Sequence, residues 1–285
     1  MLLPGTVQAT ATARAREFAF GDADFEALRV LVKQQTGINL SDSKRELVYG
    51  RVARRLRALG LRSFGEYRAL LERGGAEEMV QFCNAITTNL TAFFRESHHF
   101  EFLSEHLKRL DRAGARRLRI WSAGCSSGEE PYSIAMTILE TLQNYPRWDI
   151  RILATDLDSD VLEKAARGCY SVERVEGLGP RRRAQYLREV QTPSGPGFEV
   201  TPEVRSMVVF KQLNLMHQLP MKGPLDAIFC RNVVIYFDKD TQRELFTRMA
   251  RLQRTDALLF LGHSESLFKV SEDYELLGKT IYRRN

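Results

Sequence analysis

Apolar residues recur at every third or fourth position between residues 25 and 90, which is the spacing of amphipathic helices. Phe25, Leu28 and Val32 form the first apolar stripe, and Gly37 ends it. Further stripes follow at 48–59, after Ser63, and at 79–86, with no strand signal between them. The pattern predicts an all-α domain of four short helices at residues 21–92, preceded by a flexible tail at residues 1–20.

The pattern changes beyond residue 116, where short apolar runs alternate with helical stretches. Buried-strand runs occupy 117–121, 150–154, 225–230 and 257–261, and a closing hairpin is predicted at 274–283. Helical spacing occupies 132–142, 161–167 and 239–252. This alternation predicts an α/β domain with a parallel sheet at residues 93–285.

Residues 169–207 interrupt the alternation and are too many for a plain connection between a strand and a helix. Gly and Pro cluster at 177–180 and 193–197, a basic cluster lies at 181–183, and short β-prone pieces follow at 198–201 and 207–211. We expect an inserted antiparallel subdomain that serves in interactions. A disordered lid is the alternative.

The first strand of the α/β domain leads through a small-residue turn, Gly124 to Gly128, into a helix. This is the usual cradle for an adenosine-containing ligand. Glu129 and Glu130 follow the turn, where carboxylates repel a pyrophosphate and favour a ligand with a cationic part, such as S-adenosylmethionine. The alternative, equally weighted, is that both are solvated first-turn residues.

Asp156 stands at the tip of the second strand, where ribose hydroxyls are usually held. Its alternative role is a helix cap, which Asp158 or Ser159 can provide instead. Asn214 and residues 230–232 also follow predicted strands, and ligands of open α/β sheets bind beyond the carboxyl ends of the strands. The convergence of these ends is stronger support for a site than any one residue.

Net charge, cysteine content and the length of the apolar runs each add an expectation. Lys and Arg exceed Asp and Glu by 42 − 36 = 6, which suits an acidic partner without identifying nucleic acid. The four cysteines form no C-x-x-C pair and have no histidine at metal-ligand spacing, so we expect a reducing, cytoplasmic environment and no metal. Because no apolar run approaches about 20 residues, we expect no membrane insertion.

The second predicted helix, which Ser41 opens and Gly60 ends, carries cations opposite its apolar face. Lys44, Arg51, Arg54 and Arg55 make a candidate docking face for an acidic helix or a polyanion. A solvated surface is the alternative.

Five motifs resemble, in order, those of the chemotaxis receptor methyltransferases, the CheR family, from about Phe25 to the C-terminus. They are Thr-Thr-Asn-Leu-Thr-x-Phe-Phe-Arg at 87–95, Cys-Ser-x-Gly-Glu-Glu-Pro-Tyr-Ser at 125–133, Ala-Thr-Asp at 154–156, Phe-Cys-Arg-Asn-Val-x-Ile-Tyr-Phe at 229–237 and Gly-His-Ser-Glu at 262–265. The resemblance implies an α/β, Rossmann-like S-adenosylmethionine-dependent methyltransferase domain with a small antiparallel β insertion, preceded by an all-α domain.

Members of this bacterial family form glutamate γ-methyl esters on the cytoplasmic helical region of chemoreceptors, which serves sensory adaptation and leaves S-adenosylhomocysteine. The resemblance implies that Arg95 and Tyr236 lie at the reactive end and orient the substrate. The implied cofactor-binding residues are Asn89, Thr91, Arg95, Glu129, Asp156, Asn214, Leu215, Cys230 and Arg231. Lys44, Arg51, Arg54 and Arg55 would then engage acidic receptor helices, and the structural alternatives are an interdomain salt bridge for Arg95 and a core position for Tyr236.

Some family members bind a receptor's C-terminal tail peptide with the insertion. Here Glu199 stands where a basic or apolar residue is expected, so tail-peptide binding stays open. Two rival functions also stay open: methylation of another substrate such as nucleic acid, for which we find no binding module, and non-catalytic sensing of S-adenosylmethionine.

Overall fold

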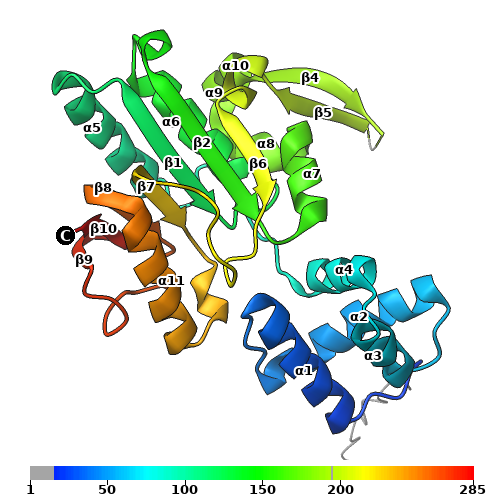
Figure 1. The fold of residues 1–285 in the computed structure, drawn as a ribbon. Helices are drawn as coiled ribbons and strands as arrows, with labels where there is room; N and C mark the ends of the chain where they lie inside the picture. Colours follow the sequence, from blue (N-terminus) through cyan, green and yellow to red (C-terminus); the bar gives the residue numbers. More distant parts are fainter. Residues whose placement is uncertain (1–15, 194) are drawn as a thin grey trace, which may run out of the picture.

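The chain folds into an N-terminal helical domain and an α/β domain in a computed structural model that describes residues 16–193 and 195–285 (Figure 1). The helical domain comprises α1 (Asp22–Thr36), the 3₁₀ turn η1 (Asp42–Lys44), α2 (Arg45–Leu59), α3 (Phe64–Glu72) and α4 (Ala76–Ile86). Gly37 and Gly60 end α1 and α2 in the left-handed conformation, which glycine adopts without steric cost. The predicted four-helix domain is therefore present.

The start of the described chain differs from the predicted tail at residues 1–20. Residues 1–15 lie outside the described residues. Phe20 is 6% exposed and packs against Phe25 and Phe64, with ring centroids 6.3 and 4.4 Å apart. Phe18 also packs on Phe64, so the two aromatic side chains extend the domain core to residue 18.

The α/β domain is built on a seven-stranded sheet of order β6-β2-β1-β7-β8-β10-β9. Its strands are β1 (Arg117–Ala123), β2 (Asp149–Asp156), β6 (Val208–Gln212), β7 (Leu225–Cys230), β8 (Gln253–Leu261), β9 (Tyr274–Gly278) and β10 (Ile281–Arg284). The first five are parallel, and β10 joins β8 and β9 antiparallel. Parallel strands place their carboxyl ends along one edge, where the predicted site residues stand.

Helices cover both faces of this sheet. They are α5 (His98–Arg112), α6 (Glu129–Thr141), the 3₁₀ turn η2 (Tyr145–Arg147), α7 (Ser159–Arg167), the 3₁₀ turn η4 (Val234–Tyr236) and α11 (Lys239–Leu252). Successive strand residues enter opposite cores: Ile120 packs with side chains of α5 and α6, and Trp121 packs with side chains of α11. Both faces are therefore buried, as the continuous apolar runs predict.

The insertion forms a separate antiparallel sheet of order β3-β5-β4, which confirms the predicted subdomain over the disordered lid. Its elements are β3 (Cys169–Ser171), α8 (Val172–Val175), η3 (Glu176–Leu178), α9 (Gly179–Tyr186), β4 (Leu187–Thr192), β5 (Gly195–Val200) and α10 (Pro202–Arg205). The short helices were not predicted. The insertion extends beside β6 and α7, on the other side of the sheet from the C-terminal hairpin (Figure 1).

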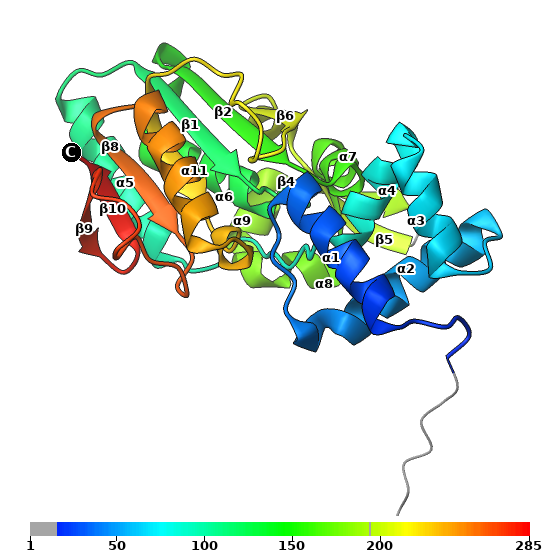
Figure 2. The ribbon, with the colours of Figure 1, turned by 60° about the horizontal axis from the view of Figure 1, so that its bottom comes forward.

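The end of α1 joins the two domains. Lys33 pairs with Asp238 at 2.9 Å, and the Asn214 side chain donates a hydrogen bond to the Gln35 carbonyl at 2.6 Å. The Asn39 amide donates to the Tyr236 carbonyl at 2.7 Å. Figure 2 shows the N-terminal helices at the opposite end of the molecule from β9 and β10. These contacts bring α1 against the carboxyl edge of the sheet.

Candidate functional site

A cavity of about 940 Å³, a volume that includes open solvent, lies where α1, the interdomain segment (residues 87–97) and the carboxyl edge of the sheet meet. Its lining comes from residues 36 and 38, 87–92 and 95, 124, 126 and 130, 156–157, 213–215, 231–233 and 236–237. Segments far apart in the sequence thus enclose one space between the two domains.

The structure brings most of the predicted site residues into this lining. The lining residues among them are Asn89, Thr91, Arg95, Asp156, Asn214, Leu215, Arg231 and Tyr236. Each stands in the interdomain segment, at or just beyond the carboxyl end of a strand, or in η4 after β7. The predicted convergence at the carboxyl edge is therefore seen in the geometry.

Glu129 and Cys230, the other two predicted cofactor-binding residues, do not line this cavity. Glu129 is fully buried, accepts a hydrogen bond from Ser127 at 2.8 Å and pairs with Arg174 of the insertion at 2.6 Å. Its neighbour Glu130 lines the cavity, because consecutive residues of a helix point about 100° apart. Cys230 packs in the core beneath α11, and the chain reaches the cavity only at Arg231.

Asp156 combines burial with two fixed partners. Its carboxylate accepts hydrogen bonds from the backbone amides of Ser126, at 2.7 Å, and Asp158, at 3.0 Å. Burial raises the pKa of Asp156 to about 6, against the opposing effect of these amides. A carboxylate oxygen accepts more than one hydrogen bond, so Asp156 retains acceptor capacity toward the cavity.

The turn after β1 approaches the opposite wall very closely. Gly124 has φ +82, and a Cβ atom there would lie 2.3 Å from Val233 Cγ2. Only glycine fits this position. The glycine therefore lets the turn pack directly against Val233, which lines the same cavity.

The interdomain segment is anchored by Asp158. Its Oδ2 atom accepts hydrogen bonds from Thr87 at 2.8 Å and from the Asn89 side chain at 2.7 Å, while Oδ1 caps α7. Asp158 thus caps α7, as the sequence analysis considered, and it also fixes the interdomain segment. The Asn89 amide nitrogen is engaged by this contact, which leaves its carbonyl oxygen for a ligand.

Arg231 connects the cavity wall to Glu96, a residue that the sequence analysis did not name. Its buried guanidinium pairs with Glu130 at 2.9 Å and Glu96 at 3.4 Å, and it donates a hydrogen bond to the Arg95 carbonyl. Arg95 itself donates to the Leu90 carbonyl at 2.9 Å. Arg231 therefore fixes the backbone beside Arg95. The position of Glu96 directly after Arg95 was the one sequence signal that pointed to it.

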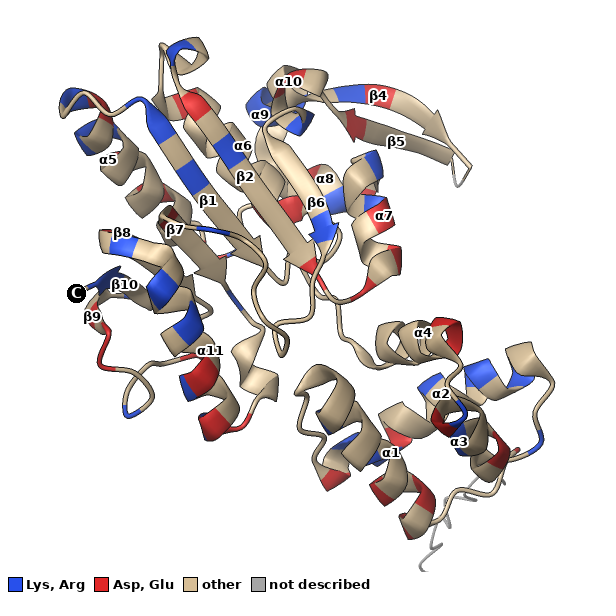
Figure 3. Cartoon of the chain, viewed as in Figure 1, with Lys and Arg blue, Asp and Glu red and all other residues tan. Residues whose placement is uncertain are grey.

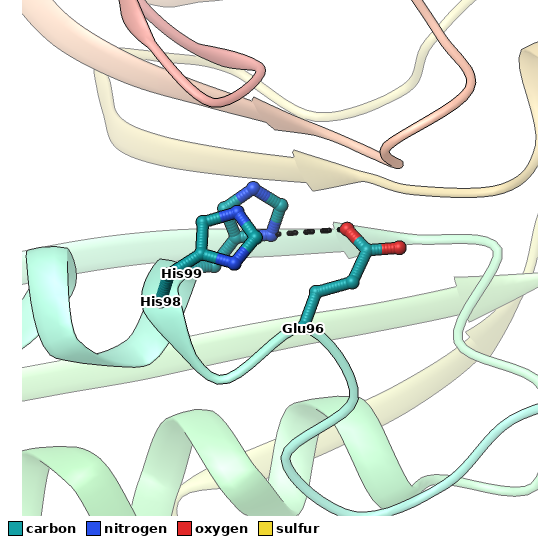
Figure 4. A group of neighbouring side chains, drawn as sticks. All are labelled: Glu96, His98 and His99. Atoms are coloured by element: carbon teal, nitrogen blue, oxygen red, sulfur yellow. Dashed lines mark ion pairs between the residues drawn. The ribbon is translucent and has the colours of Figure 1, made fainter.

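Three potential metal ligands, Glu96, His98 and His99, lie together at the start of α5 (Figure 4). Glu96 Oε2 lies 3.6 Å from His99 Nδ1, and burial lowers the pKa of His99 to about 4, so this imidazole is neutral at pH 7. Arg231 lies 3.4 Å from the same carboxylate oxygen and supplies the positive charge that a cation would supply. We therefore treat the group as part of the Arg231 network.

The candidate docking face on α2 is only partly available. Arg51 donates hydrogen bonds to the carbonyls of Ile86 and Thr87, at 2.5 and 2.7 Å, and Arg55 holds Glu78 with two bonds. Lys44 and Arg54 are exposed. Figure 3 shows cationic residues along α2, but Arg51 and Arg55 already serve the fold, because they reach α4 and the interdomain segment.

Replacing Arg55 with methionine is expected to lower the free energy of unfolding by about 3 kcal/mol, since it leaves the buried Glu78 carboxylate without its cation. Tyr67 also donates to Glu78, at 2.7 Å, and this bond remains. Chemical denaturation measures the change. The exposed Arg54→Met variant is the matched control and should change stability by less than about 0.5 kcal/mol. Equal effects of the two variants would contradict the structural role of Arg55.

Comparisons with known proteins cover nearly the whole chain. The family described as "CheR methyltransferase, all-alpha domain" matches residues 23–87, and "CheR methyltransferase, SAM binding domain" matches residues 89–283. The chain is 46% identical over 267 residues to the "Chemotaxis protein methyltransferase" of Escherichia coli (strain K12), covering 93% of this chain and 91% of that protein. It is 45% identical over 269 residues to the "Chemotaxis protein methyltransferase 2" of Pseudomonas aeruginosa, covering 94% and 95%.

No helix within residues 16–193 and 195–285 has the length and apolar character needed to cross a membrane.

Proposed function

The chain belongs to the CheR methyltransferase family, and we propose that it transfers a methyl group from S-adenosylmethionine to glutamates on the cytoplasmic helical region of a chemoreceptor. One observation carries this proposal. Asp156, Asn214, Arg231 and the interdomain segment, which are far apart in the sequence, line a single cavity. The carboxyl edge of a Rossmann-like sheet is where an adenosine-containing ligand binds.

The residues of this cavity fit S-adenosylmethionine. Asp156, which lines the cavity, would accept hydrogen bonds from the ribose hydroxyls. Glu130, at the start of α6, lines the cavity and would face the cationic end of the cofactor, sharing its charge with Arg231. Asn89, Thr91, Asn214 and Leu215 complete the enclosure from both domains.

The reaction places modest demands on the protein. The bound cofactor supplies a methyl group on a sulfonium, a leaving group that needs no acid. The substrate glutamate, with a pKa of about 4, is already an ionised nucleophile at neutral pH. No acid–base pair is therefore required, and the chain's task is to align the two groups and exclude water. Arg95 and Tyr236 line the cavity where they would orient the incoming carboxylate.

Receptor docking is assigned to the exposed cations of the helical domain. Lys44 and Arg54 are exposed beside and on α2, and Arg51 of α2 donates a hydrogen bond to the carbonyl of Thr87, which lines the cavity. An acidic, glutamate-bearing helix laid along α2 would reach the cavity mouth.

The charge reversal Lys44→Glu with Arg54→Glu is expected to raise KM for a receptor fragment by about 10-fold at low salt, because like charges then face an acidic helix. The difference from the wild-type chain should shrink as salt screens it. Initial rates of methyl transfer at two ionic strengths measure this effect, and cofactor affinity should not change. A salt-independent rise in KM would argue against an electrostatic docking face.

Cofactor affinity is expected to fall as the pH drops below about 6, the raised pKa of Asp156. Ribose hydroxyls donate to the ionised carboxylate, so binding favours the deprotonated form. Affinity is then full above the pKa of the free protein and falls by up to about tenfold per pH unit below it. Calorimetric titration with S-adenosylhomocysteine from about pH 5 to about pH 8 gives the profile. A flat profile would remove Asp156 from the ribose contact.

The deciding experiment is methyl transfer from labelled S-adenosylmethionine to a chemoreceptor cytoplasmic fragment, followed by treatment with alkali. Label released as methanol identifies a carboxyl methyl ester and supports the proposal. Tight cofactor binding without transfer to any receptor fragment would favour the sensing function or another protein substrate. Alkali-stable label on nucleic acid would favour the remaining rival.

A further inference from the structure

Glu265, at the end of the Gly-His-Ser-Glu motif, has a side chain that accepts five backbone hydrogen bonds. Oε1 accepts from the amides of Val233, Val234 and Ile235 at 2.9, 2.9 and 3.2 Å. Oε2 accepts from Asn232 at 2.8 Å and from Gly262 at 2.6 Å. The residue is 4% exposed and does not line the cavity, so its influence on the cavity passes through the backbone that it holds.

Four of these amides belong to the segment that forms one cavity wall. Asn232 and Val233 line the cavity, and the segment continues as η4 to Tyr236. The first amides of a helical turn have no partner within the turn. Asn232 also adopts a left-handed conformation with φ 59, which residues other than glycine adopt at some cost. The segment therefore depends on an acceptor from elsewhere in the chain, and Glu265 provides it.

The turn that carries Glu265 is packed tightly against the same segment. A Cβ atom at Gly262 would lie 2.3 Å from the Asn232 side-chain nitrogen. The next residue, His263, contacts Glu96 at 3.1 Å, and Glu96 pairs with Arg231. The turn at 262–265 thus contacts both walls of the reactive end, the one with Tyr236 and the one with Arg95.

We propose that Glu265 is a positioning residue for methyl transfer, which fixes the backbone of residues 232–236 and thereby the place of Tyr236 at the reactive end. The proposal rests on the proposed function for the role of Tyr236. The carboxylate is suited to this task because it offers acceptors on both oxygens and no donor. Glutamine has the same shape, but its NH₂ group would face backbone N–H donors.

Glu265→Gln is expected to lower kcat by about 10-fold or more, because reacting groups displaced by a fraction of an ångström lose alignment. The decisive readout is a double-mutant cycle with Tyr236→Phe. If Glu265 acts through Tyr236, adding Glu265→Gln to Tyr236→Phe should change kcat by less than about twofold. Multiplicative effects of the two substitutions would overturn the proposal, since a general loss of structure would act on both backgrounds equally.

Amide hydrogen exchange tests the positioning without any activity. The Gln variant should exchange faster at residues 232–235 and 262, with protection of α5 and α6 unchanged. Unchanged exchange at 232–235 would overturn the proposal even if no receptor fragment is ever methylated, which separates its failure from that of the proposed function. If the Gln variant does not fold, Glu265→Asp, which keeps the charge but is shorter by one methylene, should show the faster exchange at residues 232–235. Glu272→Gln, an exposed glutamate of the same loop, is the matched control.

Discussion

Asp156→Asn is expected to weaken the binding of S-adenosylmethionine by about 100-fold, because hydrogen bonds to a charged group are each worth about 1.5–3 kcal/mol. The substitution removes the charge that would accept the ribose hydroxyls. It also turns an NH₂ group toward one of two backbone amides, those of Ser126 and Asp158, that now donate to the carboxylate. Equilibrium dialysis or calorimetry with S-adenosylhomocysteine measures the loss directly.

The matched control is Asp160→Asn, an exposed acid in the first turn of α7. Its substitution changes the net charge equally but should leave cofactor affinity within about twofold, because it lies outside the cavity lining. Wild-type affinity in the Asp156 variant would contradict the ribose contact. An equal loss in both variants would indicate a general electrostatic effect instead.

The sequence predicts the framework of this site because local patterns determine it. Gly37 and Gly60 end helices as their position predicts, and the apolar runs become the parallel strands. Parallel strands place their carboxyl ends together, so Asp156 and Asn214 meet without any knowledge of their contacts. Residues that follow strands are therefore predictable as a group.

The direction in which a side chain points, and its bonding partners far away in the sequence, cannot be predicted from local patterns. Whether Glu129 or Glu130 faces the cavity depends on the rotation of α6, which the turn before it sets. Arg51 looks like any exposed cation in the sequence, although it bonds to backbone carbonyls 35 and 36 residues away. Glu265 is the clearest case, because its partners at 232–235 lie some thirty residues earlier and carry no pairing signal.

Substitutions at the reactive end should lower kcat and leave cofactor affinity nearly unchanged, whereas substitution of Asp156 should weaken cofactor binding. Tyr236→Phe and Arg95→Met are each expected to lower kcat by about 100-fold, which is the cost of a small misplacement of reacting groups. The dissociation constant for S-adenosylhomocysteine should change by less than about threefold, since Asp156 and the interdomain anchor at Asp158 stay in place. Single-turnover rates at saturating cofactor, together with calorimetry, separate the two quantities.

Two surface substitutions control for the loss of a hydroxyl and of a guanidinium. Tyr145→Phe removes a phenol that contacts Glu203, and Arg181→Met removes an exposed cation of the insertion, both outside the cavity lining. Neither should change kcat.

If Tyr236→Phe keeps the wild-type rate, Tyr236 is a wall residue whose aromatic ring alone matters, and Glu265 then positions a wall rather than a reacting group. If Arg95→Met loses cofactor affinity and turnover together, Arg95 holds the cofactor, and orientation of the substrate carboxylate falls to Tyr236.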